Sequence, residues 1–247
     1  MSVQRTAIRQ APTPAAATTE KRGLLRGTLK LLGWVAASLA ISILIEWIGM
    51  TWWWAEQGAG HARRMLETEL GYLDAIGRGS VMTEDPEAYA RAFAETGYDW
   101  LWRRTGLEWA ASAAARAPGP ESGALRRALH RAWKAVGEYV QAAVYVTELF
   151  FARLAVLSLS MPAFLLAVSM GLLDGAVQRD LRRWGGGRES SFVYHHARRL
   201  IWPAFVAAWV IYLSLPVSVH PAFVVTPFAA ATGLVVAVTV ASFKKYL

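Results

Sequence analysis

The fold is decided by residues 200–243, which read LIWPAFVAAWVIYLSLPVSVHPAFVVTPFAAATGLVVAVTVASF. This stretch contains no Asp, Glu, Lys or Arg, and its apolar run is interrupted only at His220 and Pro221. About 20 consecutive apolar residues in a helix span the hydrocarbon core of a bilayer. The stretch therefore predicts two membrane helices, at 200–219 and 222–243, joined by a tight turn.

Two further stretches have the same character. Residues 154–173 carry no charge, and residues 31–54 carry only Glu46 before ending in three consecutive tryptophans. Because the lead of 31–54 is long and basic, and no small-residue cleavage site follows it, we interpret it as an uncleaved anchor rather than a signal peptide. The predicted fold is all-α: a polytopic membrane protein with four transmembrane helices and a helical extracytoplasmic region.

Composition supports this class. Hydrophobic residues make up 55% of the 247-residue chain and charged residues 18%, which is lower than in most soluble domains. Twelve tryptophans fit a protein that meets two membrane–water interfaces. The chain has no cysteine, which excludes a disulfide scaffold, a thiolate metal site and a cysteine nucleophile.

The distribution of basic residues predicts the orientation. Residues 1–30, 174–199 and 244–247 together hold 14 of the 26 Lys and Arg residues, whereas residues 55–142 have a slight acidic excess. Lysine and arginine accumulate in cytoplasmic loops. Both termini are therefore predicted to be cytoplasmic in a bacterial inner membrane. The net charge of +8 then reflects topology, and a nucleic-acid surface is not needed to explain it.

The predicted soluble parts differ in character. Residues 1–30 are expected to form a disordered basic tail. Residues 55–142 are predicted to be helical outside the membrane, with an amphipathic stripe over 61–76 and a helix that begins at Asp85-Pro86. Residues 143–173 continue a long helix that starts near Ser122 and enters the membrane. The aromatic side chains of the outer region either pack among its helices or form a docking face with exposed tryptophan.

Ionisable residues inside spans are costly and usually paired. Glu46 and Arg153 both fall in the outer half of their predicted spans, so a structural ion pair between them is predicted. The alternative interpretation is that Glu46 and Arg153 form a proton or ion relay. It would make the protein a small ion or solute transporter or channel, although the spans lack other midplane polar groups. Gly27 and Gly33, six apart, do not have the four-residue spacing of closely packed membrane helices.

The connection at 174–199 is dense in specific polar residues and is predicted to form a compact helical hairpin around Gly185. Its basic residues are interpreted as anchors to acidic lipid, as a docking surface for a cytoplasmic partner, or as a contact to DNA phosphates. No catalytic, cofactor or metal site is predicted, because no nucleotide-binding loop, metal-ligand spacing or supported nucleophile occurs. The partner-docking candidates are Arg179, Arg182, Arg183, Arg188, Glu189, Tyr194 and His195.

Several elements of this connection carry a family resemblance: Asp174-Gly175, the run Arg-Asp-Leu-Arg-Arg at 179–183, Gly-Arg-Glu-Ser at 187–190 and Tyr-His-His at 194–196. With these elements the chain resembles the integrating conjugative element membrane protein family over most of its length. The resemblance implies a non-enzymatic inner-membrane accessory or scaffold subunit of conjugative DNA transfer, associated with type IV secretion. It also implies a partner such as the coupling ATPase or another secretion-channel subunit, and it assigns no catalytic residues.

Overall fold

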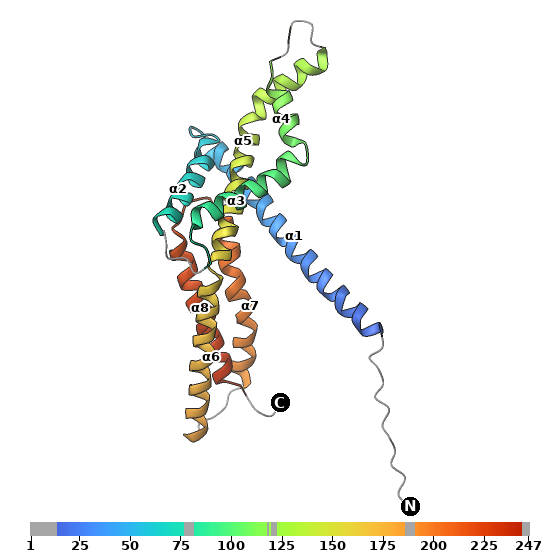
Figure 1. Cartoon of the computed structure of the whole chain (residues 1–247). Coiled ribbons are helices and arrows are strands. Elements are labelled where there is room, and N and C mark those ends of the chain that lie inside the picture. The colour runs from blue at the N-terminus through green and yellow to red at the C-terminus, as the bar shows by residue number, and fades with distance from the viewer. Residues whose placement is uncertain (1–13, 77–81, 118, 120–122, 186–190, 244–247) are drawn as a thin grey trace, which may run out of the picture. The chain divides into compact units, whose positions relative to one another are not determined.

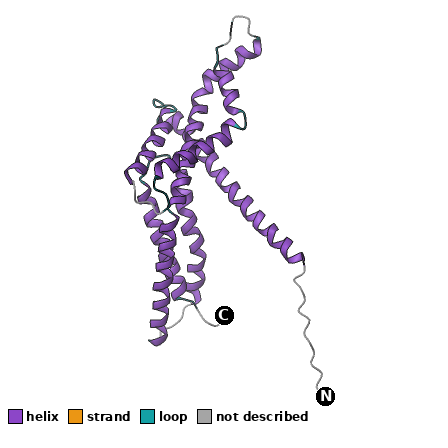
Figure 2. Ribbon diagram, in the orientation of Figure 1, coloured by secondary structure: helices purple, strands orange, loops and turns teal. Residues whose placement is uncertain are grey.

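The structure, a computed structural model, describes residues 14–76, 82–117, 119, 123–185 and 191–243. All regular elements in these ranges are helices, and none is a strand (Figures 1 and 2). The N-terminal unit, residues 1–38, and the unit formed by residues 39–247 are distinct, and helix α1 (Pro14–Trp52) runs through both. The predicted all-helical class is confirmed.

Helix α1 begins within the segment predicted to be a disordered tail. Residues 14–30 are helical, and residues 1–13 lie outside the described residues. Three alanines open the helix, and leucine, lysine and arginine follow, all strong helix formers. Residues 14–30 therefore extend the apolar helix toward the N-terminus, so α1 begins well before the apolar stretch at residue 31.

The extracytoplasmic prediction corresponds to α2 (Gly60–Ile76), α3 (Pro86–Tyr98), a π-helical turn, η2 (Asp99–Arg103), α4 (Leu107–Ala115) and the first half of α5 (Ala124–Leu159). Helix α3 starts where Asp85-Pro86 predicted: the Asp85 side chain accepts a hydrogen bond from the Ala88 backbone N–H at 2.8 Å. Helices α2, α3 and α4 all pack against α5, which is the central helix of this region.

The predicted continuous rod is interrupted once. Helix α5 ends at Leu159 and α6 (Met161–Trp184) follows after Ser160. Pro162, in the first turn of α6, has no N–H to donate to the preceding turn. At this break the Ser160 hydroxyl donates to the Val156 carbonyl at 2.8 Å, and the Ser160 backbone N–H donates to the same carbonyl at 3.0 Å.

Helices α6, α7 (Ser191–Ser214) and α8 (Pro221–Ala241) form a bundle in which α8 packs along both others. Their shared core contains Phe164 of α6, Ala208 of α7, and Val225 and Ala229 of α8. The two arms of the predicted hairpin at 174–199 are the ends of α6 and α7, which both continue into the bundle, and residues 186–190 between them lie outside the described residues.

Three helical segments are long and apolar enough to cross a membrane: Leu32–Trp52, Pro221–Ala241 and a stretch within Ala124–Trp184. The predicted span at 200–219 is not among those found in the described residues. Helix α7 ends at Ser214, near Pro216, so its apolar part is shorter than predicted. A membrane-spanning length of α7 therefore includes Arg198 and Arg199.

Candidate functional site

A buried arginine lies where three parts of the fold meet. Arg153 of α5 is 3% exposed. Its Nε donates to both carboxylate oxygens of Glu69 at 3.0 Å, and its Nη2 donates to Oε1 at 2.5 Å. Nη1 donates to the Leu215 carbonyl at 2.6 Å, and Nη2 to the Val217 carbonyl at 3.0 Å. The guanidinium therefore joins α5 to α2 and to the segment that connects α7 with α8.

Glu69 completes this centre. It is 3% exposed and also accepts a hydrogen bond from the hydroxyl of the buried Tyr212 in α7, at 3.3 Å. Burial raises the pKa of Glu69 above its ordinary value, and the hydrogen bonds and charge of Arg153 oppose that rise. A buried charge with this many partners is stabilised in place, whereas loss of one partner leaves the other charge uncompensated.

A second buried carboxylate lies nearby, in α1. Glu46 is 2% exposed, and its two oxygens lie 3.0 and 3.1 Å from Nδ1 of His61 in α2. The Trp54 ring stacks on the His61 ring with 4.1 Å between centroids. This pair fixes the start of α2 against the end of α1.

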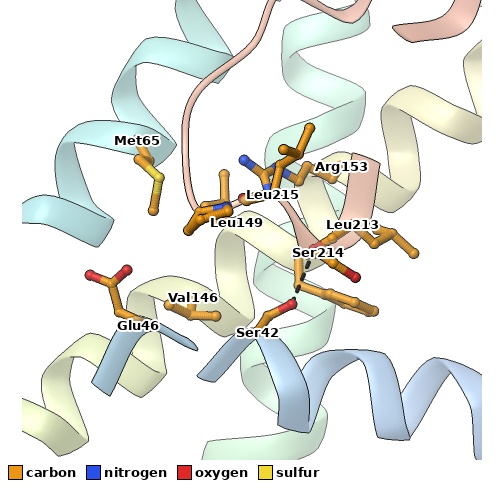
Figure 3. A pocket seen from close by; sticks show the side chains of 11 residues that line it. Ser42, Glu46, Met65, Val146, Leu149, Arg153, Leu213, Ser214 and Leu215 are labelled. Atoms are coloured by element: carbon orange, nitrogen blue, oxygen red, sulfur yellow. Dashed lines mark hydrogen bonds between the residues drawn. The ribbon is translucent and has the colours of Figure 1, made fainter. Parts of the chain in front are cut away.

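The predicted Glu46–Arg153 ion pair is replaced by these two pairs. Both residues line one cavity of about 20 Å³, but they lie on different sides of it (Figure 3). Such a volume has room for about one water molecule. The alternative of a transporter that uses these two residues gains no support, because each side chain is bound by protein groups.

His61 and Glu69 were not among the predicted site residues. The burial of Glu69 could have been predicted from the sequence. This residue lies four residues after Met65 and four before Leu73, on the apolar stripe of α2. A carboxylate on that face needs a buried partner. Nothing local indicated that the partner is Arg153, 84 residues away.

The predicted docking residues divide into two groups. Tyr194 is 8% exposed and packs against Phe243, with 5.6 Å between ring centroids, and the Arg179 guanidinium lies 5.6 Å from the centre of the same ring. These two contacts hold α6 and α7 to the C-terminal end of α8. The other predicted candidates form the second group.

Arg183 is exposed and lies 3.9 Å from the Asp180 carboxylate, and His195 is exposed beside Tyr194. Arg182 is half-buried. The predicted candidates Arg188 and Glu189 lie outside the described residues. No cluster of three or more potential metal ligands occurs among the residues that were described.

Residues 53–244 match the family model described as IncC plasmid conjugative DNA transfer protein DtrJ-like. The chain belongs to the DtrJ-like family. No curated protein and no solved structure matches it. The match covers the Arg153–Glu69 centre and the basic ends of α6 and α7, whereas Glu46 precedes it.

Membership of the DtrJ-like family implies a role in conjugative DNA transfer. The resemblance inferred from the 174–199 motifs is confirmed at this level. The family is described for a plasmid, so the assignment to an integrating conjugative element stays a prediction.

Proposed function

We propose that this DtrJ-like protein is a non-enzymatic scaffold subunit of the conjugative apparatus in the bacterial inner membrane, associated with type IV secretion. In this proposal it has four spans and both termini in the cytoplasm. The basic ends of α6 and α7 bind a cytoplasmic partner, with the coupling ATPase as the leading candidate. The observation that carries the docking proposal is the set of exposed basic residues, Arg183, Arg198 and Arg199, on two helices that end together beside Phe243.

The surface of the α6–α8 bundle supports a membrane location. Large apolar side chains are exposed on all three helices, which fits contact with lipid. Examples are Leu165, Leu166, Met170 and Leu173 on α6, Trp202, Val210 and Ile211 on α7, and Phe223 and Leu234 on α8. Helix α7 has the same apolar outer surface as its neighbours, which supports counting it as the fourth span.

The proposed topology can be tested with single cysteines, because the natural chain has none. We expect Glu56→Cys, between α1 and α2, to react with a membrane-impermeant maleimide in intact spheroplasts. Trp184→Cys, at the 92% exposed end of α6, is expected to react only after lysis. Labelling of Trp184→Cys in intact spheroplasts would contradict the proposed orientation.

The proposed docking surface can be tested by charge reversal. We expect Arg182→Glu with Arg183→Glu to reduce co-purification of the coupling ATPase by about tenfold or more. The two glutamates would repel the acidic surface that the arginines are proposed to bind. Arg63→Glu with Arg64→Glu, an exposed basic pair on α2, is the matched control and should capture the ATPase normally. Adding Trp184→Cys to the reversed variant verifies that its topology is unchanged. Undiminished capture with correct topology would refute docking at this surface.

A further inference from the structure

Helix α4 is only partly packed. None of its residues is buried, and Trp109 is 73% exposed. The helix packs on α5 and η2, and His130 of α5 lies 3.2 Å from the Ala114 carbonyl. Helix α4 and the N-terminal half of α5 thus form a two-helix arm.

A groove of about 350 Å³ lies between the two helices of this arm. Its apolar lining comes from Trp109, from three alanines of α4 and from Leu129 of α5, and Arg116 and Arg126 also border it. Alanine side chains leave room for another backbone to approach closely. The groove therefore has the lining expected of a site for a helix.

The exposed apolar surface continues along α5. Leu125, Leu129, Ala132 and Val136 follow one another at spacings of four, three and four residues, which is one face of a helix. All four are exposed. A helix laid in the groove would find a continuous apolar stripe.

The charged side chains that line the groove, Arg116 and Arg126, are both basic. Residues 124–136 contain no Asp or Glu. They contain four basic residues, which are Arg126, Arg127, Arg131 and Lys134. At roughly 100° per residue, Arg127 and Lys134 lie on the face of α5 opposite the stripe, whereas Arg126 lies beside it and borders the groove together with Arg116. These two arginines favour a partner with Asp and Glu beside its own apolar residues.

The arm lies far from the proposed membrane bundle. Leu125 precedes Arg153 by 28 residues of the same helix, a rise of about 40 Å at 1.5 Å per residue. Figure 1 shows α4 and this half of α5 extending away from α6, α7 and α8. The bilayer around the bundle does not reach this stripe.

We propose that the α4–α5 groove binds an amphipathic helix of a partner protein, with apolar residues on one face and acidic residues along its edges. A second copy of this chain fits less well, because a symmetric contact would bring the same basic residues together. This site is separate from the cytoplasmic docking surface and lies on the opposite side of the membrane in the proposed topology.

The test uses the full chain in nanodiscs of zwitterionic lipid and a synthetic labelled helix as the probe. The probe carries leucines at spacings of four, three and four with glutamates on both edges. A matched peptide has lysine in place of each glutamate. We expect the glutamate peptide to bind about tenfold or more tightly than the lysine peptide in fluorescence anisotropy.

Variants separate docking from misfolding. Leu129→Asp should weaken binding of the glutamate peptide, and Arg116→Glu with Arg126→Glu should reverse the preference toward the lysine peptide. Thermal unfolding of the reversed variant verifies that it is folded, so that its altered preference reports the groove. Arg63→Glu with Arg64→Glu should leave the preference unchanged.

Four results would overturn the proposal. They are equal binding of the two peptides, an unchanged preference in the reversed variant, self-association of the chain that Leu129→Asp abolishes, and binding of the full chain through this groove to anionic vesicles in place of the glutamate peptide. The last result would assign the groove to lipid.

Discussion

Arg153→Ala is expected to lower the free energy of unfolding by about 3–5 kcal/mol, because it leaves the Glu69 carboxylate buried without its cation. The same change removes the donors to the Leu215 and Val217 carbonyls, so the segment between α7 and α8 also loses its attachment. Thermal unfolding in mild detergent measures this loss. Conjugative transfer should fall with the amount of folded protein.

Two further variants identify the cause. Arg153→Leu combined with Glu69→Leu removes both charges and should regain part of the lost stability, as apolar replacements of buried ion pairs commonly do. Arg63→Ala breaks the exposed Arg63–Glu67 pair, whose side chains are 62% and 59% exposed, and should leave unfolding unchanged. An Arg153→Ala protein as stable as the natural chain would show that the buried centre does not hold the fold.

Gly171→Leu is expected to separate α6 from α8. A Cβ at Gly171 would lie 2.2 Å from the Gly233 carbonyl oxygen, and one at Gly233 would lie 2.7 Å from the Ala167 carbonyl oxygen. Both obstructions are backbone, so no side-chain rotation relieves them. Overpacking of this kind costs about 1–3 kcal/mol, and more when the backbone must move.

The measurement is again thermal unfolding in detergent, with transfer frequency as a second readout. Gly71→Ala on α2 is the matched control, because no atom lies within 4 Å of its added Cβ. That control should keep its stability or gain about 0.5–1 kcal/mol from reduced backbone freedom. A Gly171→Leu protein that unfolds at the same temperature as the natural chain would mean that α6 and α8 do not pack through their glycines.

The glycine contact was readable in part from the sequence. Gly171 and Gly175 are four residues apart on α6, and Gly233 and Ala237 are four apart on α8. This is the spacing that lets membrane helices approach closely. Only Gly27 and Gly33 were compared with this spacing, so the contact was not predicted. Even with the spacing recognised, the pairing of α6 with α8 was visible only in the structure.

In the basic connection at 174–199, too, part of the structure follows from the sequence and part only from the packing of the helices. Its helical ends follow from local signals, because Gly185 ends α6 and residues 191–199 at the start of α7 contain no glycine or proline. The burial of Tyr194 does not follow from those signals. It depends on Phe243, which the bundle brings beside it from the C-terminal end of α8.

The sequence by itself determined the all-helical class, the apolar segments and the asymmetry of charge, because hydropathy and helical period are properties of short stretches. The tertiary structure alone decided which buried charges meet. Arg153 pairs with Glu69 and Glu46 with His61, since the packing of α2 over the ends of α1 and α5 brings these side chains together. Burial makes such pairing obligatory, but only the arrangement of helices selects the partner.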